Sequence, residues 1–171
     1  MDGLEKLEYR GYDSAGIAVF EKTGIKTVKT KGKLKDMREK LVKEGSPVGH
    51  CGIGHTRWAT HGEPSDLNSH PHSNGRVTIV HNGIIENYIE LKEFLTEKGY
   101  TFKSQTDSEI IACLLDYYYS ERNPLRAITE TVKELRGSYA LGIIFRDFPD
   151  RVYATRKESP LIVGIGENEY F

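Results

Sequence analysis

Apolar and polar positions follow two different periods in the first third of the chain. Residues 2–9 have the spacing of the end of a helix. Two β-rich runs, 14–20 and 25–30, then flank a short glycine-containing turn, as the strands of a hairpin do. The second run alternates lysine with β-branched residues, which is typical of a half-exposed strand. Apolar residues next recur at helical spacing between 33 and 43. We therefore predict a hairpin followed by a helix.

The second half of the chain contains three stretches with helical spacing and four short β-rich runs. The helices are predicted at 86–98, 107–119 and 124–135. The strands are predicted at 77–80, 138–145, 151–155 and 161–163. A capping box formed by Thr106 and Glu109 and an Asn123-Pro124 pair indicate two of the helix starts. This order of strands, helices and strands predicts an α+β sandwich, not a doubly wound sheet.

The middle of the chain lacks any period. A glycine-rich run at 49–55 predicts a place where backbones approach closely. Between 57 and 75, prolines, histidines and small polar residues dominate, and an irregular segment of this length in a compact domain is usually functional. Asn82-Gly83, between two apolar runs, has the sequence of a tight hairpin turn, so we predict a turn there.

Composition narrows the possible partners and compartments. A chain of 171 residues is long enough for one domain with a substantial core. Its 24 Lys and Arg nearly balance its 25 Asp and Glu, so nucleic acid is not an expected partner. No apolar run approaches the roughly 20 residues that span a bilayer, and the start of the chain does not resemble a signal peptide. We expect a cytoplasmic protein without membrane contact, whose two cysteines, Cys51 and Cys113, are free thiols.

Several residues could carry chemistry, but each has a simpler explanation when considered alone. The irregular segment contains Arg57, Trp58, Thr60 and His61. A loop arginine is most often a solvated charge, and a lone tryptophan most often anchors packing. His70 and His72 flank a proline without the further ligands of a zinc site, so we expect no metal and no cofactor. Asp107 begins a predicted helix, where the helix dipole already favours a carboxylate.

Taken together, four long strings identify a family. They are LEYRGYDSAG (7–16), GHTRWATHG (54–62), HNGIIEN (81–87) and SQTDSE (104–109). In this order they closely resemble the glutaminase domain of the glutamine–fructose-6-phosphate aminotransferases, which are class II glutamine amidotransferases with an N-terminal nucleophile. The resemblance covers essentially the whole chain. It implies a single domain over 1–171, folded as an αββα sandwich of two antiparallel sheets between helix layers.

The resemblance also implies how free glutamine would be recognised. Arg57 would hold the α-carboxylate through a bidentate contact, which lysine cannot reproduce. Asp107 would pair with the α-ammonium. Thr60 and His61 would contact the substrate or shape its pocket, and Trp58 would act as a lid that excludes water.

The catalytic groups implied by the resemblance are present except for one. The Asn82 side chain and the Gly83 backbone N–H would form an oxyanion hole, with Arg10 supporting the catalytic end of the site. The family's nucleophile is the thiol of an N-terminal cysteine whose own α-amine acts as the base. Residue one is Met1 here, and neither internal cysteine matches the nucleophile position. The chain as written is therefore expected not to hydrolyse glutamine.

We accordingly expect a chain truncated at both ends, without the family's opening strand and the downstream sugar isomerase domains. The parent enzyme would be a homodimer that hydrolyses glutamine to glutamate and passes the ammonia to fructose 6-phosphate, giving glucosamine 6-phosphate. Two alternatives remain open. The chain could be a glutamine-binding remnant or non-catalytic module, or it could be the glutaminase domain of a phosphoribosyl-pyrophosphate amidotransferase.

Overall fold

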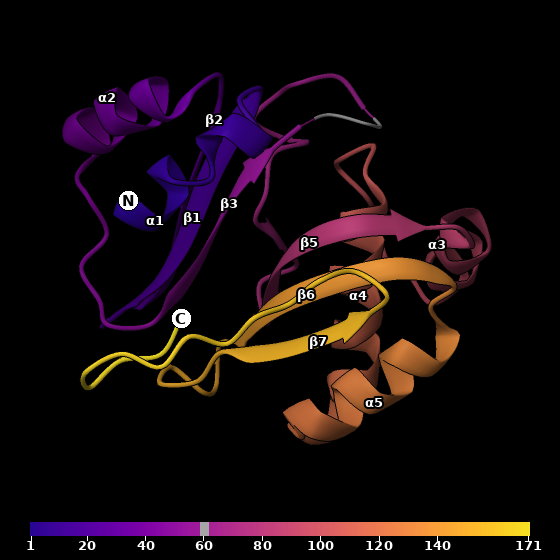
Figure 1. Ribbon diagram of the computed structural model, residues 1–171. Helices are drawn as coiled ribbons and strands as arrows, with labels where there is room; N and C mark the ends of the chain where they lie inside the picture. The colour runs from indigo at the N-terminus through magenta and orange to yellow at the C-terminus, as the bar shows by residue number, and fades with distance from the viewer. Residues whose placement is uncertain (59–61) are drawn as a thin grey trace.

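The computed structural model describes residues 1–58 and 62–171, with the backbone alone for Arg10. Two antiparallel sheets are stacked between helices, and the layers follow one another across the molecule (Figure 1). Among the described residues, no helix is long and apolar enough to cross a membrane. The observed architecture is the α+β sandwich that the sequence predicts.

The first sheet has the strand order β2-β1-β3. Its elements are α1 (Asp2–Glu5), the 3₁₀ turn η1 (Glu8–Arg10), β1 (Ser14–Glu21), β2 (Gly24–Lys31), α2 (Leu34–Glu44) and β3 (Gly52–Arg57). The hairpin of β1 and β2 and the helix after it are confirmed. Helix α2 covers the outer face of this sheet with Leu34, Met37 and Leu41, which pack on Ala15 and Val28 in a small core.

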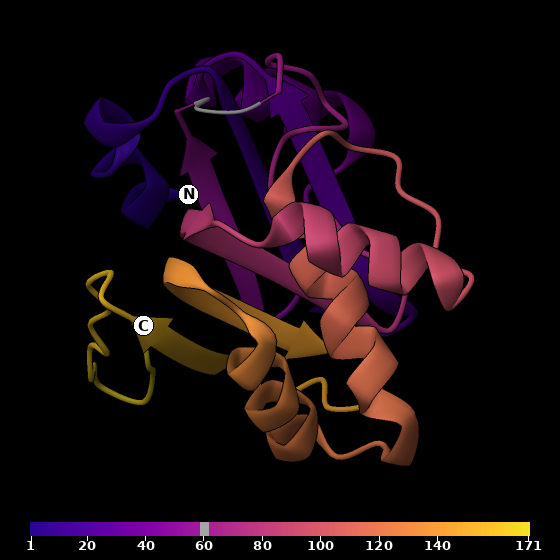
Figure 2. The same ribbon diagram turned by 90° about the vertical axis from the view of Figure 1, so that its right-hand side faces the viewer.

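The second sheet has the strand order β4-β5-β6-β7. Its elements are β4 (His72–Ser73), β5 (Val77–Ile85), α3 (Tyr88–Glu97), α4 (Asp107–Tyr118), the 3₁₀ turn η2 (Tyr119–Glu121), α5 (Pro124–Glu134), β6 (Gly137–Phe145) and β7 (Tyr153–Lys157). Figure 2 shows the three helices lying over the outer face of this sheet. The larger core lies there, and α4 contributes an unbroken run of buried residues to it.

The two sheets meet through a thin apolar layer. Ala18, Phe20 and Ile53 of the first sheet form one cluster with Ile144 of the second. Backbones in this region approach as the glycine-rich run predicts, because a Cβ on Gly52 would lie 2.6 Å from the carbonyl oxygen of Ala18. The cluster of Ala18, Phe20, Ile53 and Ile144 holds the two sheets face to face.

The predicted caps form, with one difference. Asn123 accepts a hydrogen bond from the backbone N–H of Arg126 at 3.1 Å, as expected. At the start of α4, Thr106 accepts from the N–H of Glu109 at 3.4 Å. The Glu109 carboxylate instead accepts from Lys103 and Ser104, so only half of the predicted capping box is present.

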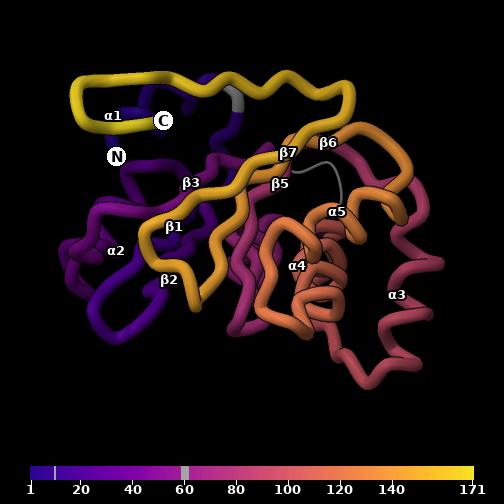
Figure 3. Tube along the Cα trace, turned by 90° about the horizontal axis from the view of Figure 1, so that it is seen from below, coloured from indigo at the N-terminus to yellow at the C-terminus, as the bar shows by residue number. Residues whose placement is uncertain are grey.

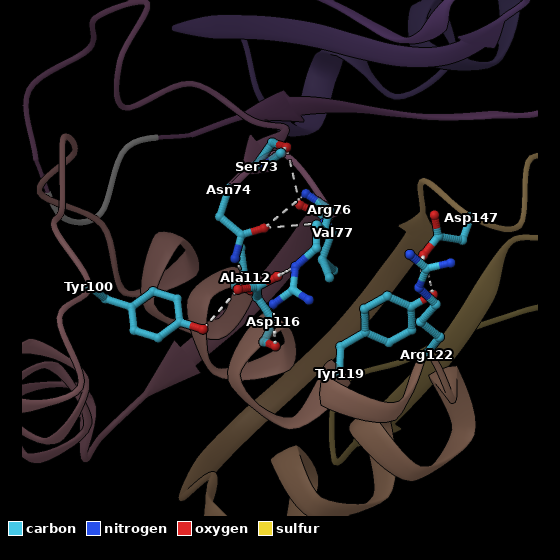
Figure 4. Close-up of polar contacts among 11 residues, drawn as sticks. Ser73, Asn74, Arg76, Val77, Tyr100, Ala112, Asp116, Tyr119, Arg122 and Asp147 are labelled. Carbon is cyan, nitrogen blue, oxygen red and sulfur yellow. Dashed lines mark hydrogen bonds and ion pairs between the residues drawn. The ribbon is translucent and has the colours of Figure 1, made fainter.

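Asp116 ties α4 to the start of β5 (Figure 4). The Arg76 Nε donates to one carboxylate oxygen of Asp116 at 2.5 Å, and the Tyr100 hydroxyl donates to the other at 2.8 Å. Asn74 donates to the carbonyl of Ala112, one turn earlier in the helix, at 3.3 Å. Helix α4 is therefore fixed on the sheet well behind its N-terminus, which carries Asp107.

The prediction of a turn at Asn82-Gly83 is wrong. Both residues lie inside β5, opposite Ala140 and Tyr139 of β6. Gly83 has a φ of 141°, and a Cβ there would lie 2.1 Å from the carbonyl oxygen of Ser138. The glycine is needed for a close approach of two paired strands, and this pairing overrides the local turn preference.

The predicted strand at 161–163 is also wrong. Glu158 has a φ of 65°, and the Ser159 N–H bonds back to the Lys157 carbonyl at 2.7 Å, so the chain turns away from the sheet after β7. The segment that follows doubles back on itself as an irregular loop (Figure 3), joined by a single bridge between Ile165 and Tyr170. Because the turn directs this apolar run away from β7, it does not add a strand to the second sheet.

Candidate functional site

A cavity of about 520 Å³ opens at one edge of the sandwich. Both sheets, α1 and the first residues of α4 contribute to it. The lining residues are Leu4, Leu7, Gly54, His55, Thr56, Arg57, Trp58, His70, His81, Asn82, Gly83, Ile84, Thr106, Asp107, Ser108 and Ser138. Five residues singled out from the sequence thus share one cavity, namely Arg57, Trp58, Asn82, Gly83 and Asp107.

Three other residues singled out from the sequence cannot be placed in this cavity. Thr60 and His61 lie outside the described residues. For Arg10 only the backbone is described, at the end of η1. The next residue, Gly11, lies against the end of β3, where a Cβ would be 2.7 Å from the carbonyl carbon of Arg57. The roles of Arg10, Thr60 and His61 therefore stay predictions.

Arg57 is a buried cation at the end of β3, with 6% of its surface exposed. Its guanidinium donates to the carbonyl oxygen of Gly62 at 3.4 Å. Burial lowers the pKa of Arg57, and the nearby carboxylates of Asp13 and Asp107 oppose this effect. Since a guanidinium stays protonated in proteins, the cavity holds a partly desolvated positive charge suited to an anion.

Asp107 supplies a negative charge to the same cavity, from the first position of α4. One carboxylate oxygen accepts from the Ile85 N–H at 2.9 Å, and the other accepts from the Ser108 hydroxyl at 3.2 Å. These bonds join the end of β5 to the start of the helix. The helix dipole further favours a carboxylate at this position. The cavity therefore presents groups of both charge signs.

Asn82 and Gly83 bring two hydrogen-bond donors to the cavity wall, a side-chain amide and a backbone N–H. Both residues are exposed, and both line the cavity. At the mouth of the cavity lies Trp58, which is 59% exposed. The Trp58 ring packs edge-on against Tyr12, with 5.1 Å between ring centroids. The tryptophan is thus held by a neighbouring aromatic ring beside the opening.

Four buried or half-buried histidines form a layer beside the cavity, and the sequence drew attention only to His70 and His72 among them. His55, His70 and His81 line the cavity. The ring centroids of His55 and His70 are 4.3 Å apart, and those of His70 and His72 are 4.9 Å apart. The sequence signal that could have indicated this layer is a histidine at a strand position that faces inward. Two of these histidines lie in a segment without a period, so their facing could not be predicted.

Burial keeps these four rings neutral. It lowers the pKa of His55 to about 4 and that of His72 to about 3. Burial lowers the pKa of His70 well below its usual value, and it lowers that of His81 even though Asp107 opposes the shift. Within residues 1–58 and 62–171, no group of three or more His, Cys, Asp or Glu side chains is arranged to hold a metal ion.

Neither thiol of the chain has the properties of an attacking group. Cys51 and Cys113 do not line the cavity. Burial raises the pKa of the Cys51 thiol, and it raises that of Cys113 to about 12, with further contributions from Glu109 and Asp116. The nucleophilic form of cysteine is the thiolate, so these shifts make both thiols less reactive.

The chain matches known proteins both in sequence and in fold. A family model described as a glutamine amidotransferase domain matches residues 55–169. The glutamine–fructose-6-phosphate aminotransferase [isomerizing] of Clostridium tetani is 58% identical over 173 residues, covering 100% of this chain and 28% of that protein. The Thermus thermophilus protein of the same name is 51% identical over 174 residues, with the same coverage. The chain thus spans 28% of the length of these curated relatives.

The fold of the chain is also similar to that of solved structures. The glutamine phosphoribosylpyrophosphate amidotransferase from B. subtilis superposes with a TM-score of 0.80 at 26% identity, over 98% of this chain and 37% of that one. A glutamine aminotransferase class-II domain protein from Silicibacter pomeroyi has the same fold, with a TM-score of 0.64 at 19% identity, over 88% of this chain and 71% of that one. The match of the family model to 55–169, more than half of the sequence, shows that the chain belongs to the glutamine amidotransferase domain family.

Proposed function

We propose that the cavity binds free glutamine and that the domain serves the glutamine-dependent amino transfer for which its curated relatives are named. The observation that carries this proposal is the pairing of Arg57 with Asp107 in one cavity, close enough for the Asp107 carboxylate to act on the pKa of Arg57. A free amino acid carries one carboxylate and one ammonium. A site with one buried cation and one fixed carboxylate matches both groups.

The remaining groups fit the side chain of glutamine. Arg57 would bind the α-carboxylate by two parallel hydrogen bonds, and Asp107 would bind the α-ammonium. The Asn82 amide and the Gly83 N–H would then donate to the side-chain carbonyl oxygen as it becomes negative, each worth about 3 kcal/mol of barrier. Because the neighbouring histidines are neutral, they would add no charge that competes for the carboxylate.

We assign recognition and oxyanion stabilisation to the residues of this chain, and not the attacking group. Trp58, held by Tyr12, would cover the bound amino acid and limit the access of water. Thr60 and His61 would complete the substrate contacts, and Arg10 would support the catalytic end. Cys51 and Cys113 are excluded as nucleophiles, because both lie outside the cavity and burial raises both pKa values.

The acceptor is inferred from the names of the relatives, and the assembly and compartment are carried over from the family resemblance. We propose that ammonia from glutamine passes to a sugar isomerase domain that converts fructose 6-phosphate to glucosamine 6-phosphate, in a cytoplasmic homodimer. The sequence identity of 58% to such a protein, against 26% to the phosphoribosylpyrophosphate amidotransferase, supports the sugar phosphate as the acceptor.

Isothermal titration tests the proposed recognition. L-glutamine should bind the purified chain, and D-glutamine should bind much more weakly, since it cannot satisfy both charged partners and the amide site together. Arg57→Lys should weaken L-glutamine binding at least tenfold, because lysine cannot form the bidentate contact. The matched control is Arg136→Lys, at an exposed arginine 3.8 Å from Glu90 and outside the cavity. Equal affinity of the wild type and Arg57→Lys would reject the proposal.

A further inference from the structure

The Asp107 carboxylate is held by a hydrogen-bond network that extends away from the cavity. Its Oδ1 accepts from the hydroxyl of Ser108, a residue only 2% exposed. The same hydroxyl oxygen lies 2.9 Å from Nδ1 of His81 and 3.5 Å from Nε2 of His70. Ser108 therefore stands between the carboxylate and two buried rings, and the direction of its proton depends on them.

The proton position on His70 follows from its other nitrogen. The backbone N–H of His81 donates to His70 Nδ1 at 3.3 Å, so Nδ1 must be unprotonated. Burial keeps the ring neutral by lowering its pKa well below the usual value. A neutral imidazole carries one proton, which must then lie on Nε2. His70 Nε2–H faces the Ser108 oxygen as a donor, at the long end of the hydrogen-bond range.

The Ser108 hydroxyl has one proton and two possible acceptors. If it donated to His81, a serine lone pair would face the Asp107 oxygen at 3.2 Å, which is repulsive. If it donates to Asp107, His81 must carry its proton on Nδ1 and donate to Ser108 at 2.9 Å. The second arrangement satisfies every contact of the hydroxyl. It leaves His81 Nε2, which has no hydrogen-bond partner in the described part of the chain, as a bare acceptor.

We propose that Ser108 is a positioning residue of the amino-acid site, and that its hydroxyl, oriented by His70 and His81, fixes the Asp107 carboxylate for the ammonium group. This inference rests on the proposed binding of glutamine. With the Ile85 N–H on one oxygen and the Ser108 hydroxyl on the other, the carboxylate plane cannot rotate freely. The lone pairs that remain free are then held ready for the ligand. Ser108 need not touch glutamine itself.

The first test reads the proton positions without any ligand. Long-range ¹H–¹⁵N correlation spectra of the histidine rings should show His81 as the neutral Nδ1–H form and His70 as the Nε2–H form. Ser108→Ala removes the acceptor of the His81 proton, so the Nδ1–H resonances of His81 should shift as this hydrogen bond is lost, while Asp107 Oδ1, 3.8 Å from Nδ1, keeps the proton on that nitrogen. Ser108→Thr keeps the hydroxyl and should retain the wild-type spectrum. A wild-type His81 protonated on Nε2 alone would overturn the proposal.

The second test asks whether the hydrogen-bond network affects the binding of the α-ammonium group of glutamine and not the rest of the ligand. Ser108→Ala should weaken L-glutamine binding roughly 5- to 10-fold, less than the more than tenfold effect of losing a direct hydrogen bond to a charged group, because Ser108 acts on the ligand only through Asp107. Glutaramate, which lacks the ammonium, should bind the variant and the wild type equally. Ser104→Ala is the matched control, because it removes a serine hydroxyl from a different carboxylate, that of Glu109, 2.7 Å away beside the same helix start. This control should leave both affinities unchanged.

The outcomes separate this inference from the proposed function. If the wild type binds neither ligand while the ring spectra are as described, the proposed function fails and Ser108 is reduced to a structural residue. If the wild type binds glutamine and Ser108→Ala weakens both ligands equally, glutamine recognition stands and the positioning role is rejected.

Discussion

The two sheets contribute opposite walls of the cavity, and they differ in the packing behind them. The first sheet is covered by the single helix α2 over a small core, and its strand β2 carries three lysines among β-branched residues. The second sheet is covered by α3, α4 and α5 over the larger core. Asn82, Gly83 and Asp107 come from this heavily packed half, whereas Arg57 comes from the lightly packed half.

This difference matches the demands that the proposed roles place on each group. Donors to a developing oxyanion must be held in place before the reaction, since their contribution depends on geometry. A guanidinium that grips a carboxylate on a substrate that enters and leaves tolerates more local movement. We therefore expect the second half to set the geometry of the site, and the first half to open and close on the ligand.

Truncating a buried side chain in each of the two cores should give the largest effects on the free energy of unfolding, and the two effects should differ. Leu114 in α4 and Met37 in α2 are both fully buried. Leu114→Ala should lower the free energy of unfolding by about 2–5 kcal/mol, and Met37→Ala should fall at the low end of that range, because its small core can collapse more easily. Urea denaturation measures both. Amide exchange should show opening confined to β1, β2 and α2 in Met37→Ala. A larger cost for Met37→Ala would contradict the comparison.

Acid should loosen the boundary between the halves, where the neutral histidines lie. The folded state takes up protons on His55 only near pH 4, whereas the unfolded chain does so near 6.5. Between these values the unfolded state binds more protons, so stability is complete above about pH 6.5 and falls with decreasing pH. The slope is about 1.4 kcal/mol per pH unit for each such histidine.

Urea midpoints at several pH values between 7.5 and 5 measure this slope. His55→Gln should flatten it by removing one of the titrating rings. His50→Gln, at an exposed histidine, should leave the slope unchanged. A wild-type stability that is constant over this window would show that the rings are not held neutral.

Gly83→Ala tests how tightly β5 and β6 are packed in the second sheet, the half with the larger core. A Cβ at Gly83 would lie 2.1 Å from the carbonyl oxygen of Ser138, whereas a Cβ at Gly75 would meet nothing within 4 Å. Both glycines have positive φ, 141° and 99°, so Gly75→Ala controls for backbone strain alone. Gly83→Ala should cost at least about 1 kcal/mol more than Gly75→Ala in thermal unfolding. Similar costs would mean that β5 and β6 separate easily at the cavity wall.

The smallest effect on stability is expected at Asp66, whose hydrogen bonds attach a loop segment to the first sheet. Asp66 accepts from Lys40 Nζ at 2.9 Å and from the Lys31 N–H at 2.7 Å, which holds the segment before His70 on the first sheet. Asp66→Asn should cost at most about 1 kcal/mol, since the pair is exposed, but should speed amide exchange in residues 62–70. Glu39→Gln, at the exposed Lys35–Glu39 pair, is the control. Unchanged exchange in Asp66→Asn would show that the tether does not order the segment.

The sequence predicted the helices and strands in which apolar and polar positions alternate with a regular period. It missed the structure that depends on pairing between residues far apart in the chain. Helices α2 to α5 and the β1–β2 hairpin follow from apolar spacing and caps. The strand through Asn82 and Gly83 does not, because its pairing with β6 outweighs a local turn preference. Likewise, no local pattern could show that Ser108 lies between two histidines that precede it by 38 and 27 residues.

The family resemblance brought together residues that share one cavity, which no single residue could have indicated. Arg57, Trp58 and Asp107 each had an ordinary structural explanation, and only their joint occurrence in four ordered strings indicated a common pocket. The fold then shows why they meet, since β3 ends and α4 begins at the same edge of the sandwich. Arg10, Thr60 and His61 remain predictions from the resemblance.

Amide chemical shifts recorded during titration with L-glutamine test the central claim most directly. If the cavity between the two halves is the glutamine site, the largest changes should fall at Arg57, Gly83 and Asp107, and D-glutamine at the same concentration should leave these signals in place. Changes confined to residues outside the cavity, or equal responses to both enantiomers, would contradict the account.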